Sequence, residues 1–359
     1  MSLLHPSRTA LMPHLSAISP HAAIPGGVFE VLGEHLVLNT NDGPQMPLAY
    51  FGQLAASLDM VRPTRLLARV PEGAISSEFT LRTSPDVSNH AATSNPIFAN
   101  IGVSMAENLH LIANPCVDAT GNVYAMVSGS RGQKVPVSIY RIDRDMQMRP
   151  FARDLLNVSA LAIGPTGDLF ASSRSEGTVY RITPEGHISI FAEGMGTATG
   201  LAFDSQGNLF VGDRSGTIFK IHPDGEIFVF ATLEPSVAAY HLCFQADGVL
   251  LVTAPTTSSQ QSIHAIEPDG TTSVFFRGLG RPQGMALDTD GNLYVAASLQ
   301  GQRGIVRITH SKQAELFISG NDLVGMCFME DGCAALATAH TLFYVDLGVD
   351  GRPLTQSSL

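Results

Sequence analysis

The residues best placed to do chemistry in this chain are arginines that follow directly after short apolar runs. In "LFVGDRSGTIF" (209–219), Arg214 interrupts an alternating apolar pattern that resumes at Thr217. A guanidinium group keeps its charge and offers a planar set of donors suited to a carboxylate or a phosphate. Five arginines share this kind of context and are predicted to bind an anionic ligand: Arg131, Arg174, Arg214, Arg281 and Arg303.

A second interpretation applies to each of these arginines. Carboxylates such as Asp213 and Glu176 lie close in the sequence, and exposed ion pairs between such neighbours are common on protein surfaces. An arginine that is paired in this way would have no ligand to bind. The sequence leaves both interpretations open.

The arginines are embedded in a repeat. Segments such as "IGPTGDLFASS", "FDSQGNLFVGD" and "LDTDGNLYVAA" align on glycines that follow one another at intervals of 40 to 46 residues: Gly121, Gly167, Gly207, Gly248, Gly291 and Gly332. Each interval holds four short apolar runs separated by turns in which glycine supplies a positive φ. Alternation makes each run a strand, and six four-stranded sheets around an axis form a β-propeller. We therefore predict an all-β fold with a six-bladed propeller over residues 113–356.

The propeller predicts where the functional side chains gather. Connections between second and third strands emerge on the same face as the crossovers between blades. Arg131, Arg174, Arg214 and Arg303 belong to such connections and Arg281 to a crossover, so all five share one face. Side chains that begin the six first strands are predicted to face the central channel and, where polar, to bind the ligand: Asn114, Ser159, Thr199, Tyr240, Gln283 and Val324.

Two residues are candidates for a catalytic role. His241 follows Tyr240 at a position where other repeats carry Gly or Ala, and an imidazole is the usual general base near neutral pH. Asp213 is a weaker candidate at the end of a strand. The alternative for His241 is a histidine packed in the core.

The strand that closes the ring is left open. The fourth strands repeat a phenylalanine, and Leu354 stands at the sixth equivalent position: Phe151, Phe191, Phe230, Phe275, Phe317 and Leu354. The last blade closes either with this C-terminal segment or with a strand from before the first repeat, because a sheet edge in a propeller needs a partner or protection.

The N-terminal part does not repeat. Short alternating strands with Gly and Pro turns over residues 15–102 predict a β-sandwich. The order of "AISP", "PGGVFEVLG", "YFG" and "VPEGA" resembles an immunoglobulin-like IPT/TIG domain. That resemblance implies a domain that spaces, docks or dimerises, so a homo-oligomer or a protein partner is expected to form through it, and no chemistry is assigned to it.

Composition excludes several classes of partner. Lys and Arg number 21 and Asp and Glu 32, so the formal net charge of −11 argues against binding nucleic acid or an anionic membrane through the whole surface. No apolar run has the length of a signal peptide or a membrane span. The four cysteines lack the spacing of a zinc site and are predicted to be buried thiols. We expect a cytoplasmic protein with no membrane or nucleic-acid partner.

The pattern "GLAFDSQGNLFV" (200–211) followed by "RSGTIFKI" (214–221) resembles the propellers of the regucalcin and gluconolactonase (senescence marker protein) family and the NHL repeats, over residues 113–356. In the lactonase branch, the resemblance implies a divalent cation, usually calcium, held by a Glu, an Asn and an Asp. The matching positions here are Asn114, Thr199 and Gln283. None is a carboxylate, and a hard cation needs anionic oxygens, so we predict no metal site; a divalent cation enters only through the resemblance.

These observations leave three functions open. The first is a propeller that binds a small polar, anionic molecule such as a sugar acid or a lactone on its arginine-bearing face. The second is a lactonase or esterase in which His241 or Asp213 activates water. The third is an NHL-type scaffold for a protein partner.

Overall fold

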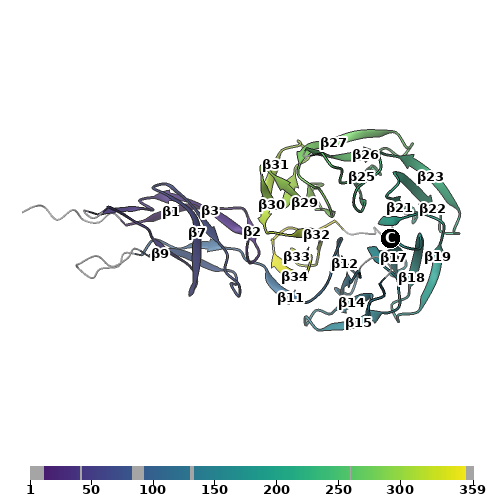
Figure 1. Ribbon diagram of the computed structural model, residues 1–359, viewed down its shortest axis with the longest axis horizontal. Coiled ribbons are helices and arrows are strands. Elements are labelled where there is room, and N and C mark those ends of the chain that lie inside the picture. The colour runs from purple at the N-terminus through teal and green to yellow at the C-terminus, as the bar shows by residue number, and fades with distance from the viewer. Residues whose placement is uncertain (1–11, 41–42, 83–92, 130–132, 259, 353–359) are drawn as a thin grey trace, which may run out of the picture. The chain divides into compact units, whose positions relative to one another are not determined.

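The computed structural model describes residues 12–40, 43–82, 93–129, 133–258 and 260–352, which form two compact units (Figure 1). The first unit comprises the described residues up to Val103 together with Ile318–Gly320, and the second comprises the others. Every helix or strand assigned in the described ranges is a strand, which confirms the all-β class. No helix able to cross a membrane is present in these ranges.

An antiparallel sheet of seven strands makes up most of the first unit. In spatial order it contains β1 (His14–Ser19), β3 (Val28–Glu34), β8 (Arg65–Arg69), β7 (Leu54–Arg62), β6 (Leu48–Phe51), β9 (Ser77–Arg82) and β10 (Ile97–Ala99). Smaller elements are β2 (Ala22–Ala23) and the hairpin of β4 (Leu38–Thr40) and β5 (Gly43–Gln45).

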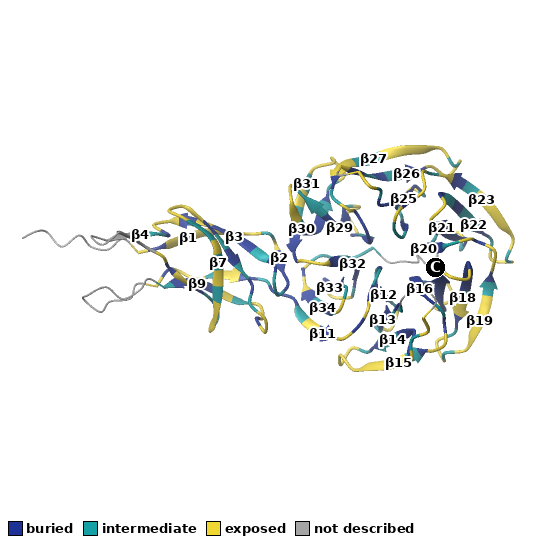
Figure 2. Cartoon of the chain, viewed as in Figure 1, coloured by how far each residue is buried: buried dark blue, intermediate teal, exposed yellow. Residues whose placement is uncertain are grey.

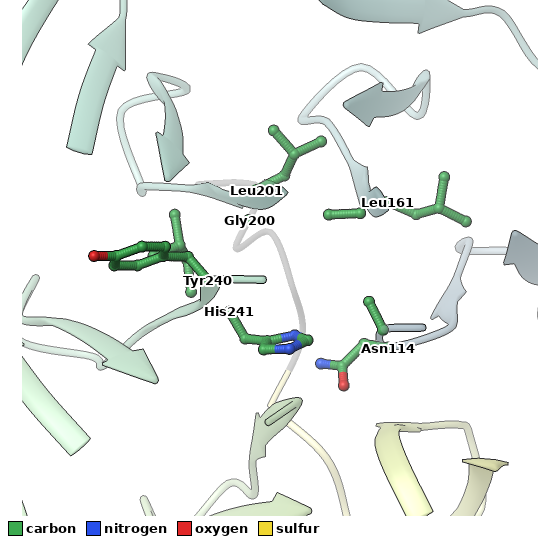
Figure 3. A pocket seen from close by; sticks show the side chains of 9 residues that line it. Asn114, Leu161, Gly200, Leu201, Tyr240 and His241 are labelled. Carbon is green, nitrogen blue, oxygen red and sulfur yellow. The ribbon is translucent and has the colours of Figure 1, made fainter. Parts of the chain in front are cut away.

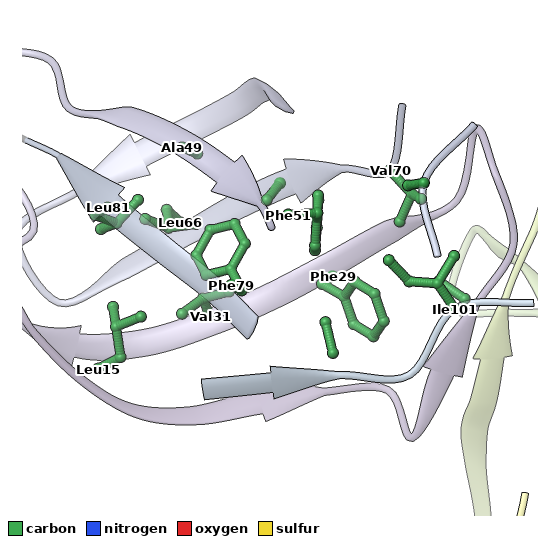
Figure 4. Packing of buried hydrophobic residues seen from close by; sticks show 14 of the residues in the cluster. Leu15, Phe29, Val31, Ala49, Phe51, Leu66, Val70, Phe79, Leu81 and Ile101 are labelled. Carbon is green, nitrogen blue, oxygen red and sulfur yellow. The ribbon is translucent and has the colours of Figure 1, made fainter. Parts of the chain in front are cut away.

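Three aromatic rings lie at the centre of the core of this unit. The ring of Phe51 is 5.9 Å from that of Phe29 and 4.9 Å from that of Phe79 (Figure 4). Buried aliphatic side chains such as Val31 and Leu66 pack around them. Residues on β3 and β8 alternate between more and less buried positions, as the two-residue period of a strand requires. The immunoglobulin-like assignment of this unit stays a prediction.

The second unit is the predicted six-bladed propeller (Figure 1). Blade 1 holds β12 (Cys116–Val117), β13 (Val123–Met126), β14 (Ile139–Ile142) and β15 (Met148–Ala152). Blade 2 holds β16 (Val158–Ile163), β17 (Leu169–Ser173), β18 (Thr178–Ile182) and β19 (Ile188–Ala192). Blade 3 holds β20 (Ala198–Phe203), β21 (Leu209–Asp213), β22 (Thr217–Ile221) and β23 (Ile227–Thr232).

The other three blades follow the same order from the axis outward. Blade 4 holds β24 (His241–Phe244), β25 (Leu250–Thr253), β26 (Gln261–Ile266) and β27 (Thr272–Leu279). Blade 5 holds β28 (Met285–Leu287), β29 (Leu293–Leu299), β30 (Gln302–Ile308) and β31 (Ala314–Ser319). Blade 6 holds β32 (Leu323–Phe328), β33 (Cys333–Thr338) and β34 (Leu342–Asp346).

A strand from before the first repeat closes the ring. β11 (Val103–Ala106) lies beside β34 as the outermost strand of blade 6, in the order β11-β34-β33-β32. Of the two alternatives that the sequence left open, the structure contains the borrowed strand. Leu354, the sixth equivalent of the fourth-strand phenylalanines, lies outside the described residues.

The D-x-x-G turns form for the reason expected from their residues. In the turn between β20 and β21, the Asp204 carboxylate accepts hydrogen bonds from the backbone nitrogens of Gln206 (2.9 Å) and Asn208 (2.8 Å). Gly207 has a φ of 82°, which a residue with a Cβ rarely adopts. The aspartate thus satisfies backbone donors that the strands leave unpaired.

Aromatic side chains pack between the blades. The ring of Phe170 in blade 2 lies 5.0 Å from Phe191 in the outer strand and 4.9 Å from Phe203 in blade 3, with both pairs edge to face. Phe210 makes the same pair of contacts one blade further along. Such pairs contribute about 0.5–1.5 kcal/mol each beyond their buried area. The inner strands are almost wholly buried, whereas outer strands such as β19 and β23 expose one face (Figure 2).

Hydrogen bonds link the inner strands of successive blades. Ser159 Oγ donates to the carbonyl of Ala198 (2.8 Å). Thr199 Oγ1 accepts a bond from the Tyr240 nitrogen (3.0 Å). Thr253 Oγ1 donates to the carbonyl of Gln283 (2.7 Å). These bonds satisfy backbone groups that would be costly to bury unpaired.

Asn114 joins three blades. Its Nδ2 donates to the carbonyl of Met285 in blade 5 (2.7 Å), and its Oδ1 accepts a bond from the nitrogen of Met326 in blade 6 (3.2 Å). A Cβ at Gly284 or Gly325 would overlap the Asn114 side-chain oxygen, so both glycines make room for it. The side chain expected to bind a ligand is therefore part of the ring closure.

Replacing Asn114 tests this role. Asn114→Ala leaves two backbone groups without partners, and we expect it to lower the free energy of unfolding by about 1–3 kcal/mol. Ser273→Ala, at an exposed position of β27, is the matched control and should change stability little. Chemical denaturation of the full chain measures both. An Asn114→Ala protein as stable as the control would contradict the proposed closure bond.

Candidate functional site

A cavity of about 370 Å³ opens at the mouth of the central channel. Its wall is built from the starts of inner strands, from turns between second and third strands, and from crossovers. Lining residues predicted from the sequence are Ser159, Arg174, Thr199, Arg214, His241, Arg281, Gln283 and Val324. The fold thus brings three of the five arginines to the same cavity as four of the neutral channel positions and the candidate base.

Three guanidinium groups line this cavity without a carboxylate beside them. Arg174 lies in the turn after β17, Arg214 in the turn after β21, and Arg281 just before β28. Among the described residues, none of the three lies within 4.0 Å of a carboxylate, and no carboxylate lines the cavity. Burial, and then the charge of Arg214, lower the pKa of Arg174.

The carboxylates considered as partners are used elsewhere. Asp213 accepts hydrogen bonds from the nitrogen of Thr197 (2.8 Å) and from the Ser215 hydroxyl. Glu176 accepts one from the Tyr180 hydroxyl (2.6 Å). Asp213 is buried and does not line the cavity, so its geometry is that of a turn-stabilising residue.

Arg303 has a different place from the one expected. It lies within β30, opposite Ser298, rather than in a connection, because the hairpin of blade 5 is longer than the others. Its guanidinium donates to the carbonyls of Arg281 (2.9 Å) and Leu323 and to the side-chain oxygen of Gln283. Burial, and then Arg281, lower its pKa to about 10. Arg131 lies outside the described residues.

His241 contributes an uncharged imidazole to the cavity wall. The side chain is 6% exposed, and burial lowers its pKa to about 4. His241 also lines a smaller cavity of about 30 Å³ together with Asn114. Figure 3 shows the imidazole ring directed toward Asn114. An imidazole with so low a pKa is neutral at pH 7 and is a weak general base.

The neutral side chains predicted to face the channel differ in whether their polar atoms are available to a ligand. The hydroxyls of Ser159 and Thr199 border the cavity, but both donate to backbone carbonyls, at 2.8 Å and 3.0 Å respectively. Gln283 keeps its amide nitrogen free of any partner in the described part of the chain. Tyr240 is fully buried, and its ring points away from the channel, with its hydroxyl donating to the Glu234 carbonyl (Figure 3).

The residues present do not fit a calcium ion. The three positions that match the ligands of the lactonase branch hold Asn114, Thr199 and Gln283, and none is anionic. The amide of Asn114 is bonded on both sides to backbone groups. A hard cation would face guanidinium groups instead of carboxylates, which is unfavourable. The cavity therefore offers no anionic ligand set for a catalytic metal ion among its described residues.

Several cavity residues were missed from the sequence. His110, Leu111 and Ile112 belong to the segment that leads into blade 1, and 237–239 belong to the crossover before β24. The ring of His110 lies 6.3 Å from that of His340, next to the lining residue Ala339. Their only sequence signal is a position in a crossover or connection, which every blade shares.

Comparison with known proteins finds lactonase relatives in sequence and six-bladed propellers among similar structures. Lactonase drp35 from Staphylococcus aureus is 26% identical over 211 residues, covering 52% of this chain and 64% of the lactonase, so less than two thirds of that relative is spanned. Regucalcin from Agrobacterium tumefaciens has a TM-score of 0.56 at 14% identity, covering 72% of this chain and 98% of its own. A gluconolactonase-like structure has a TM-score of 0.57 at 17% identity, covering 70% of this chain and 93% of its own. No family model matches.

The low pKa of His241 predicts how stability depends on pH. An unfolded histidine titrates near 6.5, so between about 6.5 and 4 the unfolded chain binds more protons than the folded one. The contribution of His241 to the free energy of unfolding should be fully present above pH 6.5. It should fall by about 3 kcal/mol as the pH approaches 4.

Two substitutions isolate this contribution. His241→Gln should lose this part of the pH dependence, whereas His187→Gln, at an exposed turn position, should retain it. Chemical denaturation at pH 7 and pH 4.5 gives the comparison. The expectation is wrong if His241→Gln and the wild type lose the same stability on acidification.

Proposed function

We propose that the propeller binds a small organic anion of the sugar-acid or lactone-like class in the cavity at the channel mouth. The observation that supports this most directly is the group of Arg174, Arg214 and Arg281 around one cavity that no described carboxylate lines. Arg174 is half-buried, whereas Arg214 and Arg281 are exposed. Like charges that line one cavity repel each other, and a bound anion relieves this repulsion. Hydrogen bonds from a guanidinium to an anion contribute about 1.5–3 kcal/mol each.

The size of the cavity favours a small ligand. Its volume of about 370 Å³ lies near the lower end of the roughly 300–1,000 Å³ common for ligand sites. The amide nitrogen of Gln283 and the neutral imidazole of His241 can bond hydroxyl groups of the ligand. This combination of cations at the edge and neutral polar groups in the wall suits a polyhydroxylated carboxylate.

Removing one guanidinium tests the proposal. Arg214→Ala should weaken the binding of D-gluconate at least about tenfold, because a charge-assisted bond is lost. Arg277→Ala removes an exposed arginine of the outer strand β27 and is the matched control. Isothermal titration calorimetry at low ionic strength gives the dissociation constants, and circular dichroism shows that both variants fold.

Two results would contradict the proposal. The first is no binding of gluconate or of its lactone by the wild type, and the second is an Arg214→Ala protein that binds as tightly as Arg277→Ala. Because no described carboxylate lines the cavity, prior treatment with a chelator should leave the dissociation constant unchanged.

A lactonase activity at the same cavity is the second candidate, favoured by the lactonase relatives. His241 would take a proton from water as the water attacks the lactone carbonyl, and the arginines would stabilise the oxyanion. The imidazolium would then return the proton to the ring oxygen as the bond between that oxygen and the carbonyl carbon breaks, which releases the hydroxy acid. The low pKa of His241 makes the imidazole a weak general base. This favours a binding protein over a hydrolase.

Turnover of D-glucono-1,5-lactone separates the two candidates. If the protein is a hydrolase, acid release above the spontaneous rate should disappear in His241→Ala and persist in His187→Ala. A wild type that binds the lactone without faster acid release is a binding protein.

A further inference from the structure

The arginines of the cavity form two groups. Arg174 and Arg214 stand at equivalent turns of blades 2 and 3, and the inner strands of these blades are neighbours. The charge of Arg214 acts on Arg174 in addition to burial. Each guanidinium donates one hydrogen bond to a backbone carbonyl, Arg174 to that of Gly129 (3.2 Å) and Arg214 to that of Val237 (3.1 Å). The remaining donors of these two groups suit one acidic group, because a carboxylate or a phosphate accepts from both.

Arg281 lies in the blade opposite that of Arg174 and two blades from that of Arg214. It precedes β28 in blade 5, and the inner strands follow the ring in the order β12, β16, β20, β24, β28 and β32. Blade 5 is thus opposite blade 2, and β29 lies across the central opening from β17 and β21 in Figure 1. Arg281 thus approaches the cavity from the side opposite Arg174, where it can meet a second acidic group of a ligand.

The position of Arg281 is held by surrounding residues. Its φ of 45° is unusual for a residue with a Cβ, and such conformations persist only where neighbours determine them. Arg303 donates to its carbonyl (2.9 Å), and Gly280 and Ser298 exchange two backbone hydrogen bonds of 2.8 Å. Arg303 also holds the side-chain oxygen of Gln283. Arg303 is therefore a positioning residue, and no hydrogen bond of the exposed Arg281 guanidinium is found in the described part of the chain.

We infer that the ligand carries two acidic groups at opposite ends, one bound by Arg174 and Arg214 and the other by Arg281, with hydroxyl groups between them facing Gln283 and His241. This inference rests on the proposed function and narrows its ligand to a polyhydroxylated dianion. The second acidic group is a carboxylate or a phosphate, because a guanidinium fork accommodates either.

Calorimetry with matched acids tests the inference. D-Gluconate has one acidic group, D-glucarate has a second carboxylate, and 6-phospho-D-gluconate has a phosphate in its place. At least one dianion should bind the full-length protein at least about tenfold more tightly than gluconate, as one further charge-assisted contact predicts. The tighter of the two identifies the second acidic group.

Arg281→Asn locates the second contact. Asparagine tolerates the left-handed backbone conformation, so the variant keeps the local fold while it loses the charge. The dianions should lose at least about tenfold more affinity than gluconate does, because gluconate has no second acidic group for Arg281 to bind. Arg214→Ala should weaken all three acids alike, since every acid uses the paired arginines.

The outcomes separate this inference from the proposed function. Gluconate binding that requires Arg214, with no preference for either dianion, overturns the two-ended ligand and leaves the proposed function standing. Equal loss of gluconate and dianion affinity in Arg281→Asn also overturns it, because all three arginines would then share one anion. Failure of all three acids to bind overturns both.

Discussion

Closure of the ring is the constraint on which the rest of this propeller depends. A blade cannot bury its faces alone, so each packs aromatic side chains against the next, as Phe170 does with Phe203. The ring is completed by β11, which comes from before the first repeat and lies in the same sheet as β34. Asn114 adds hydrogen bonds that tie blade 1 to blades 5 and 6. Only in the closed ring do turns and crossovers from different blades meet around one cavity.

Closure also decides which polar residues remain for a ligand. The hydroxyls of Ser159 and Thr199 and the amide of Asn114 are bonded to backbone groups of their own or a neighbouring blade, where an unpaired group would be costly. Polarity at the start of an inner strand therefore has a structural cause in three of the six blades. The polar side chains left facing the cavity include the imidazoles of His110 and His241, the amide nitrogen of Gln283 and the guanidinium groups of Arg174, Arg214 and Arg281.

Charge is what distinguishes this channel mouth from a cation site. The positions where the family resemblance implies a Glu, an Asn and an Asp as metal ligands hold neutral residues, and three arginines line the same opening. A low-dielectric wall strengthens both the attraction of an anion and the repulsion of a cation. The six-bladed fold shared with regucalcin and gluconolactonase-like structures is thus combined here with a channel mouth that three arginines and no described carboxylate line. The fold alone does not imply the activity.

The sequence by itself determined the all-β class, the six blades and the face on which Arg174, Arg214 and Arg281 gather, because glycine turns and two-residue alternation are local signals that repeat. The tertiary structure decided which strand closes the ring and that Tyr240 is buried. It also decided that the Arg303 guanidinium, on β30, donates a hydrogen bond to the Arg281 carbonyl. It also placed His110 at the cavity. These features depend on contacts between residues far apart in the chain, and no local pattern carries information about which blade edge, carbonyl or side chain a residue will meet.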